Sequence, residues 1–221
     1  MMREWKKGLW DVLFPVAELP GMMSGLGDRW CERCGEPYEG EMPEIFRCSN
    51  CAGRRWHISR ARAAYRAEGA VRELIHEFKY NKEFHHLPQL TSWLEEGFER
   101  FYAEESWDAL VPVPLYPLRK REREFNQAEE LARMLGRRRG LSVWKVLERV
   151  KKTETQAKLR RSERLRNQKG AFCVKSGFDL KGRRLLIIDD VFTTGATVDA
   201  CAQVLHQAGA EHLAVLTVAR G

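Results

Sequence analysis

Hydrophobic residues recur at helical spacing through the first half of the chain. The spacing predicts one amphipathic helix over about residues 61–80 and a second over about residues 87–102. The hydrophobic residues of 1–26 also fit a short helix, which Pro15 and Pro20 interrupt. We therefore expect two long helices to follow the N-terminal region.

The second half of the chain alternates short apolar runs with helical patterns. The runs at 185–188 and 213–218 are continuous, as in strands that a parallel sheet buries on both faces. Shorter runs at 109–115 and 171–174 also predict strands. Helical patterns lie on two sets of residues: Ala128, Leu131, Ala132 and Leu135, and Val198, Cys201, Ala202 and Leu205. This alternation predicts an α/β domain with a mainly parallel sheet.

Composition places the chain among globular proteins. Of its 221 residues, 43% are hydrophobic and 31% are charged, and this length suits one medium domain with a small accessory module. No apolar run approaches the roughly 18 residues of a membrane-spanning helix. The N-terminal stretch also lacks the cleavage site of a signal peptide. The sequence therefore gives no reason to expect membrane insertion or export.

The positive charge is concentrated in one stretch. The whole chain has a net charge of +7, yet residues 119–169 hold 18 Lys and Arg against 7 Glu, a net of +11, so the remainder is −4. Such a local excess is typical of proteins that bind a diphosphate ligand or a nucleic-acid backbone. A solvated helix face is the alternative for most of the individual residues.

Four cysteines form two CxxC pairs, Cys31 with Cys34 and Cys48 with Cys51, separated by 13 residues. Each pair can offer two thiolates from a tight turn, and two such pairs complete a tetrahedral four-sulfur zinc site. Four filled positions make the zinc structural rather than catalytic. Two disulfides are the alternative, but nothing indicates export. A redox CxxC is disfavoured because the motif occurs twice.

The segment 185–197 is the most informative in the chain. Its strand delivers Asp189 and Asp190 to the carboxyl edge of the sheet, where open α/β folds bind ligands. The chain then turns and enters a helix, whose N-terminal N–H groups and dipole favour a phosphate. Adjacent acids suit ribose hydroxyls or a hydrated Mg²⁺. We therefore predict a phosphoribosyl-binding loop formed by Asp189, Asp190, Thr193, Thr194, Gly195, Ala196 and Thr197.

Two other interpretations of this loop remain open. An apolar strand ending in two aspartates could be the Mg²⁺-holding strand of a P-loop ATPase, but the chain has no GxxxxGK[ST] motif. Thr194 and its neighbours could also be a plain helix cap.

The segment resembles the phosphoribosyl diphosphate loop of type I phosphoribosyltransferases. The resemblance implies that Asp189 and Asp190 contact ribose hydroxyls, that residues 193–197 wrap the 5′-phosphate, and that Mg²⁺ accompanies the ligand. The expected fold is a type I phosphoribosyltransferase-like parallel sheet with an N-terminal four-cysteine zinc ribbon. We expect residues 1–58 to form the N-terminal segment and ribbon, and residues 59–221 the phosphoribosyltransferase-like domain.

More narrowly, the chain resembles the ComF family of competence proteins over almost its whole length. The motifs that carry the likeness are Leu13-Phe14-Pro15, the double CxxC, Val111-Pro112-Val113-Pro114-Leu115, Arg123-x-Phe125-Asn126-Gln127-Ala128-Glu129, Thr155-Gln156, Leu159-x3-Glu163-Arg164-x2-Asn167 and the diphosphate loop. The resemblance implies a cytoplasmic bacterial protein that handles incoming single-stranded DNA in natural transformation. Other competence proteins, such as a helicase, are possible partners.

One position departs from the family pattern. The family usually reads Arg-Gly-Phe-Asn-Gln, and Glu124 stands in the place of the glycine. If that glycine adopts a positive φ, a glutamate disfavours the same loop shape.

The resemblance also suggests residues that surround a diphosphate. It implies that the loop at 113–116 contacts the diphosphate and that a cationic mobile loop, similar to 151–169, closes over the site. Our candidates for this lining are Arg123, Asn126, Gln127, Arg164 and Asn167. The same charges could instead contact DNA, with the arginines at 137–139 as part of that surface.

Three functions therefore compete. The chain could be a DNA-uptake protein that uses its phosphoribosyl pocket for a ligand, or an active phosphoribosyltransferase on an unknown acceptor. It could also be a zinc-stabilised adaptor with a vestigial pocket, which the intact acids and threonine–glycine turn disfavour. No clear base-recognition hood is visible, and this weakens the case for an ordinary salvage enzyme. No catalytic residue can be assigned from the sequence.

Overall fold

The computed structural model of the chain describes residues 29–38, 46–80, 84–151, 168 and 170–221. The helix expected within 1–26 lies outside these residues. So do two candidates for the diphosphate lining, Arg164 and Asn167.

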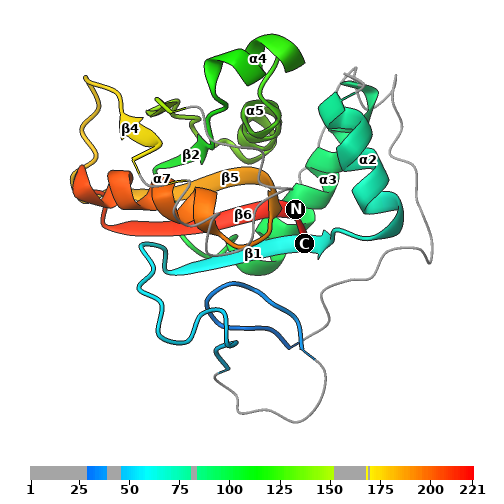
Figure 1. The fold of residues 1–221 in the computed structure, drawn as a ribbon, viewed down its shortest axis with the longest axis horizontal. Coiled ribbons are helices and arrows are strands. Elements are labelled where there is room, and N and C mark those ends of the chain that lie inside the picture. Colours follow the sequence, from blue (N-terminus) through cyan, green and yellow to red (C-terminus); the bar gives the residue numbers. More distant parts are fainter. Residues whose placement is uncertain (1–28, 39–45, 81–83, 152–167, 169) are drawn as a thin grey trace, which may run out of the picture.

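A four-stranded parallel sheet forms the centre of the molecule (Figure 1). Its strands, in spatial order, are β1 (Arg60–Arg66), β6 (His212–Arg220), β5 (Arg184–Phe192) and β2 (Ala109–Pro112). β5 and β6 are almost wholly buried, as their continuous apolar runs predicted. The predicted α/β class with a parallel sheet is confirmed.

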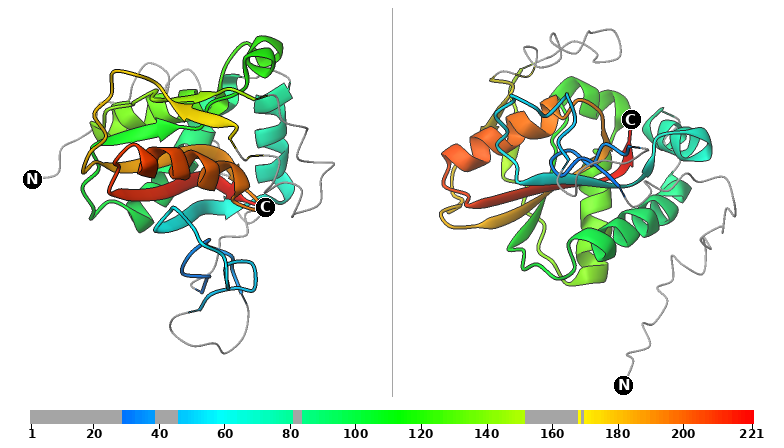
Figure 2. Two further views of the ribbon diagram at one scale, coloured as in Figure 1. Left: turned by 60° about the vertical axis from the view of Figure 1, so that its left-hand side comes forward. Right: turned by 90° about the horizontal axis from the view of Figure 1, so that it is seen from below.

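Helices cover both faces of this sheet (Figure 2). Along β5, Leu186 and Ile188 pack with α2 (Gly69–Tyr80), α3 (Leu87–Phe101) and α5 (Gln127–Arg139). Leu185 and Ile187 pack on the other face with α7 (Ala196–Gln207). Successive residues of a strand point to opposite faces, so one strand contributes to two cores. A short 3-10 turn, η1 (Phe84–His86), precedes α3.

A short helix and a separate two-stranded sheet follow β2 in the chain. The helix α4 (Pro117–Arg123) follows β2 directly, and Pro117 suits the first position of a helix. The strands β3 (Leu147–Arg149) and β4 (Phe172–Val174) pair antiparallel in a separate two-stranded sheet. Both elements border the carboxyl edge of β2 and contribute side chains to the site described below.

The helix predicted over residues 61–80 is wrong in its first part. Residues 60–66 form the edge strand β1, and the helix begins only at Gly69. Alanine and arginine favour a helix locally. Here they pair instead with β6, in a register that sets Arg60 beside Ala214 and Arg66 beside Arg220. A non-local partner therefore overrides local propensity, which sequence spacing alone does not reveal. The second helix, predicted over 87–102, is confirmed as α3.

The cysteine segment packs on the sheet beside β1. We call residues 31–35 the first knuckle and residues 48–53 the second knuckle. The first knuckle docks on β1, where Ala61 N donates to Arg33 O at 2.7 Å and Arg62 Nη1 donates to Glu32 O at 3.0 Å. All four cysteines belong to the same buried cluster as sheet residues Leu213 and Val215.

Glu124 adopts the backbone shape that a glycine would adopt more readily. It ends α4 with φ 66°, and it is the one non-glycine residue with a positive φ among the described residues. A side chain in this region costs about 1–2 kcal/mol. The loop thus keeps its left-handed residue even though the sequence places a glutamate there.

We expect the Glu124→Gly variant to be more stable than the wild type by about 0.5–1 kcal/mol. The gain is the relief of left-handed strain, reduced by the greater entropy of an unfolded glycine. Gly140→Ala is the matched control, because Gly140 ends α5 with φ 67° and an added Cβ would meet no atom within 4 Å. That variant should lose about 1 kcal/mol. Urea unfolding measures both, and a less stable Glu124→Gly variant would contradict the strain argument.

Candidate functional site

A pocket of about 290 Å³ opens at the carboxyl edge of the sheet. The ends of β2 and β5 form its floor, and the N-terminal residues of α5 and α7 face into it. Unpaired N–H groups and the helix dipole make both helix ends favourable to an anion. Parallel topology brings together residues from positions 113 and 189, far apart in the sequence.

Two aspartates at the end of β5 line this pocket. Asp190 forms an ion pair with Lys79 at the end of α2, with Nζ 2.8 Å from Oδ1. The backbone N–H of Asp190 donates to Asp189 Oδ1 at 2.9 Å. The Asp190 side chain is 13% exposed and that of Lys79 is 19% exposed, so the pair is shielded yet reachable from the pocket.

The environment makes the Asp189 carboxyl hard to ionise. Burial raises the pKa of Asp189 to about 7, and the charge of Asp190 adds to the rise. Lys79 and Arg149 act in the opposite direction and favour the ionised form. A ligand that donates hydrogen bonds to this carboxylate would further favour its ionised form.

We expect the stability of the wild type relative to Asp189→Asn to fall as pH rises from 4 to 7. The folded-state pKa of about 7 lies above the ordinary value of 3.8, so the folded protein holds this proton more tightly. Ionisation therefore opposes folding above pH 4, and the penalty levels off above pH 7. Its upper bound is about 4 kcal/mol, since one pKa unit equals about 1.4 kcal/mol. Urea unfolding at pH 5 and pH 8 tests this, and a constant difference between the two proteins would refute it.

Four of the five predicted loop residues line the pocket, namely Thr193, Gly195, Ala196 and Thr197. Thr194 does not line it. Its hydroxyl accepts a hydrogen bond from the Ala196 N–H at 3.4 Å, and its carbonyl accepts one from Arg54 at 2.9 Å. Thr194 therefore shapes the turn rather than facing a ligand.

Gly195 begins α7 with φ 71°, and a Cβ there would lie 2.6 Å from both Phe192 and Trp56. Its lack of a side chain is thus required twice, by the backbone shape and by aromatic packing. We predicted Gly195 as a member of the phosphoribosyl-binding loop; the contact observed at its side-chain position is with these two rings.

Cationic side chains surround the two acids. The pocket is lined by Lys79, Arg119, Arg123 and Arg149, against Asp189 and Asp190 as its acidic members. Arg149, on β3, is only 8% exposed. Burial, and then the charge of Arg119, lower the pKa of Arg149. Four cationic side chains that line one cavity provide a favourable setting for a multiply charged anion.

The structure also places the three described candidates for the diphosphate lining in this pocket: Arg123, Asn126 and Gln127. Asn126 caps α5, because its Oδ1 accepts from Ala128 N at 3.1 Å while its Nδ2 donates to Val113 O at 3.0 Å. Asn126 therefore orients the loop after β2.

Gln127 offers a donor that no described residue uses. Its side chain is buried, and its Oε1 accepts from Arg123 at 3.2 Å. Its Nε2 has no hydrogen-bond partner among the described residues. An unsatisfied buried donor is costly, so an acceptor atom of a bound ligand is a physically favourable partner.

Sequence reasoning missed Lys79 and Arg149. Lys79 ends a helix that shows only ordinary amphipathic spacing, and nothing local connects it to Asp190. Arg149 was counted within the basic stretch but was not singled out. Arg149 stands between Glu148 and Val150 at the end of a short strand, and nothing local signals that its charge is buried.

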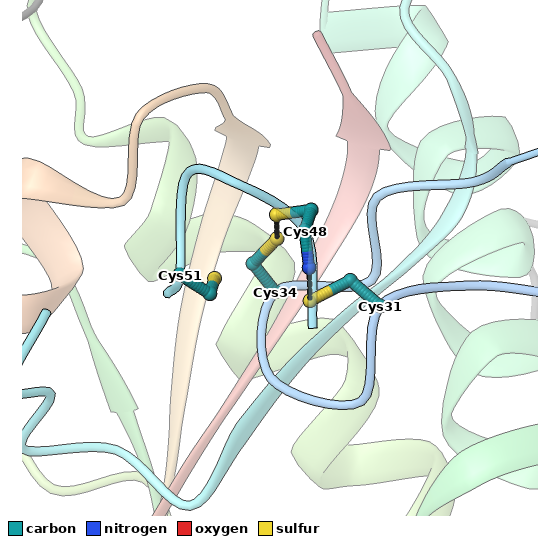
Figure 3. Close-up of side chains that lie close together, drawn as sticks. All are labelled: Cys31, Cys34, Cys48 and Cys51. Atoms are coloured by element: carbon teal, nitrogen blue, oxygen red, sulfur yellow. Dashed lines mark hydrogen bonds between the residues drawn. The ribbon is translucent and has the colours of Figure 1, made fainter. Parts of the chain in front are cut away.

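The four cysteines of the two CxxC pairs come together as a cluster (Figure 3). Their sulfur atoms all lie within 4.8 Å of one another, and Cys34 Sγ is 3.5 Å from Cys48 Sγ. All four residues are buried, and none is in a disulfide. Four sulfurs at this spacing could hold one metal ion, because tetrahedral thiolate sites place their sulfurs at comparable separations.

The electrostatics of the cluster fit a bound cation. Burial raises the pKa of Cys31, but backbone hydrogen bonds outweigh it and bring that pKa to about 7. Burial, followed by the charge of Cys31, raises the pKa of Cys34 to about 12. Burial, followed by the charge of Cys34, also raises the pKa of Cys51. The thiols oppose one another's ionisation, and a divalent ion bound to all four would remove that conflict.

Comparison with known proteins identifies related proteins and a matching domain. The phosphoribosyl transferase domain profile matches residues 125–221. Competence protein F of Haemophilus influenzae is 33% identical over 152 residues, which cover 66% of each chain. Competence protein ComFC of Bacillus subtilis is 28% identical over 190 residues, covering 81% of this chain and 72% of that protein. DNA utilization protein YhgH of Escherichia coli is 33% identical over 154 residues and 66% of each chain.

A purine phosphoribosyltransferase from Pyrococcus horikoshii, a solved structure, aligns at a TM-score of 0.36 with 19% identity, over 61% of this chain and 72% of that one. A likeness this weak carries no argument. The chain spans about two thirds of the length of the first curated relative that it matches.

The parallel sheet, the matched domain and the cysteine cluster define a protein with a type I phosphoribosyltransferase-like domain and an N-terminal four-cysteine module. Within that class, the chain belongs to the ComF family of competence proteins. In the described part of the chain, no helix has both the length and the apolar character needed to span a bilayer.

Proposed function

We propose that this protein binds 5-phosphoribosyl diphosphate with Mg²⁺ in the pocket at the carboxyl edge of the sheet. The observation that carries the proposal is the convergence of two helix N-termini, two aspartates and four cationic side chains on one cavity. Asp189 and Asp190 would accept hydrogen bonds from the ribose hydroxyls. The loop 193–197 would hold the 5′-phosphate, and Arg119, Arg123 and Arg149 would face the diphosphate.

Binding alone and catalysis remain two alternatives for this pocket. The decisive experiment measures diphosphate release from phosphoribosyl diphosphate and Mg²⁺, with and without single-stranded DNA. Equilibrium binding of the same ligand is measured in parallel by calorimetry. Binding without release supports a ligand-sensing protein, release supports a transferase, and the absence of binding would refute the proposal.

Handling of single-stranded DNA is the second part of the proposed function. Relatives are competence and DNA utilization proteins, and a basic stretch lies within residues 119–169. Two of the arginines at the end of α5 are less available for a DNA contact than their charge suggests. Arg138 pairs with Glu95 at 3.1 Å, and Arg139 pairs with both Glu95 and Glu99. Arg137 is exposed and is the better candidate for a DNA contact.

We expect binding of a fluorescent oligonucleotide to weaken steeply with salt. Four phosphate contacts on a single strand would lower the affinity roughly 50-fold between 50 and 200 mM salt. Reversing the charge of Arg137 should weaken binding more than reversing that of Arg138, whose partner is Glu95. If binding is insensitive to salt, or if neither change has an effect, a partner protein such as a helicase contacts the DNA instead.

The remaining parts of the proposal concern the module and its surroundings. We propose that zinc is the ion at the four cysteines, where it would cross-link the two knuckles and take no part in chemistry. Residues 1–58 would form the zinc-containing N-terminal part and residues 59–221 the ligand-binding domain. The basis for a cytoplasmic location is the relationship to competence proteins.

A further inference from the structure

Two residues that follow the second knuckle contact residues 193–197, which we call the phosphate loop, and the first turn of α7. Arg54 Nη1 donates to Thr194 O at 2.9 Å, and Arg54 Nη2 donates to Asp199 Oδ2 at 3.2 Å. The backbone N–H of His57 donates to Asp199 Oδ1 at 2.8 Å. These contacts join residues 140 to 145 positions apart in the sequence.

Aromatic packing reinforces the same connection. Trp56 stacks on Phe192 with ring centroids 6.4 Å apart, and the guanidinium of Arg54 lies 3.5 Å from the centre of the Trp56 ring. Both rings lie against Gly195, where even a single carbon would collide at 2.6 Å. The turn that begins α7 is thus pressed between the end of β5 and the cysteine module.

The charges explain why an arginine is needed. Asp199 lies in the first turn of α7, close to the helix end that faces the pocket. A carboxylate there would repel a bound phosphate. Arg54 pairs with Asp199 where both side chains are largely buried, at 15% and 13% exposure. The module therefore neutralises an acid that would otherwise oppose anion binding.

The first knuckle contacts the sheet, and the second knuckle leads into the residues that contact the phosphate loop. The first knuckle is bonded to β1 through Arg33 and Glu32. The second knuckle leads into Arg54, whose N–H donates to Cys51 O at 3.3 Å. The four sulfurs come from both knuckles, so an ion bound to them would tie the sheet to the phosphate loop.

We infer that Arg54 and Trp56 are positioning residues, through which the cysteine module sets the shape and the electrostatics of the phosphate loop. Neither residue lines the pocket. Arg54 fixes the Thr194 carbonyl and neutralises Asp199, and Trp56 supports Gly195. The choice of phosphoribosyl diphosphate as a probe rests on the proposed function, whereas the positioning role can be tested on the loop without any ligand.

The first measurement is hydrogen exchange of the amides of residues 193–199 in the metal-loaded protein without ligand. Arg54→Ala should raise their exchange rate about 10-fold, as expected when a buried charge-assisted contact is lost. Arg47→Ala is the matched control, because Arg47 belongs to the same module but forms only an exposed ion pair with Glu32. Equal exchange in the wild type, Arg54→Ala and Trp56→Leu would overturn the inference.

The second measurement is the affinity for phosphoribosyl diphosphate with Mg²⁺. Arg54→Ala should weaken it about 10-fold, within the usual range of coupling between sites. Adding Asp199→Asn should restore part of the loss, because the uncompensated charge is then removed. A merely structural role predicts no such rescue, since Asp199→Asn cannot restore the hydrogen bond to Thr194 O that Arg54→Ala removes. Undiminished affinity in Arg54→Ala would overturn the inference.

The two measurements separate two kinds of failure. If the wild type binds no phosphoribosyl diphosphate but the loop exchanges faster in Arg54→Ala, the proposed ligand is wrong and the positioning role stands. If the wild type binds the ligand and the variants match it in both measurements, the positioning role is wrong and the proposed function stands. Should Arg54→Ala not fold, Arg54→Lys retains the charge but not the two-point contact with Thr194 and Asp199, and is measured in its place.

Discussion

The Cys34→Ser variant is expected to lose its bound metal and to melt at least about 10 °C below the wild type. Cys34 is 3% exposed and lies in the centre of the sulfur cluster. A structural zinc can contribute on the order of 10 kcal/mol to the folding of a small module. In a chain of this size each kcal/mol shifts the melting temperature by about 2–4 °C. Elemental analysis and calorimetry of fresh protein measure the two effects.

Cys173→Ser provides the control for this substitution. Cys173 lies on β4, is partly exposed, and belongs to none of the groups that could hold a metal among the described residues. It should keep one metal ion per chain and nearly the wild-type melting temperature. Fresh wild-type protein that holds no zinc, or iron in its place, would contradict the zinc assignment. Full metal content in Cys34→Ser would show that the cluster is not the site.

The strand, turn and helix of residues 185–197 could be predicted because their signals are local. An apolar strand, two acids and a threonine–glycine turn stand in sequence, and the structure places them as β5, the turn and the start of α7. The double CxxC is equally local, since each pair is one turn of chain. In both cases the signal lies within one short segment of the chain, residues 185–197 or residues 31–51.

The surroundings of the loop could not be predicted because they depend on tertiary packing. β1 carries alanines and arginines that favour a helix, and only its pairing with β6 makes it a strand. Lys79 meets Asp190 because α2 ends above the carboxyl edge of the sheet. Arg54 and Trp56 follow a metal-type motif and were not considered for the phosphate site, since nothing in the sequence places them beside Thr194 and Gly195.

The outcome for Glu124 shows how far a family pattern can guide a structure. The pattern placed a glycine there, and the structure keeps the left-handed backbone with φ 66°. The loop shape is therefore set by its surroundings: α4 on one side and the buried Phe125 and Asn126 on the other. The packing of these neighbours outweighs the preference of a glutamate for a negative φ, at a modest energetic cost.

The second large effect concerns the acids of the pocket. We expect the double variant Asp189→Ala with Asp190→Ala to lower the affinity for phosphoribosyl diphosphate with Mg²⁺ at least about 100-fold. Each carboxylate would accept hydrogen bonds from ribose hydroxyls, and a hydrogen bond to a charged group contributes about 1.5–3 kcal/mol. The ligand-induced rise in melting temperature, which follows from binding to the native state, should therefore disappear.

Single substitutions should separate binding from stability. Asp189→Asn removes a carboxylate whose ionisation burial opposes, so at pH 8 the ligand-free variant should be more stable than the wild type while binding less ligand. Asp190→Asn should be less stable, because it removes the carboxylate that pairs with the largely buried Lys79. Opposite shifts in stability with a shared loss of affinity would be hard to explain by general unfolding.

Two neighbouring threonines supply the matched control for the pocket. Thr193 lines the cavity and Thr194 does not, so Thr193→Val should weaken binding about 10-fold, the effect of one lost charge-assisted hydrogen bond. Thr194→Val should change the affinity far less, because the Arg54 contact uses the backbone carbonyl that the variant retains. Calorimetric titration of the wild type and the five variants with the ligand and Mg²⁺ provides the comparison. An unchanged thermal shift in the double aspartate variant would mean that the ligand binds elsewhere, and equal losses in the two threonine variants would contradict the orientation of the loop.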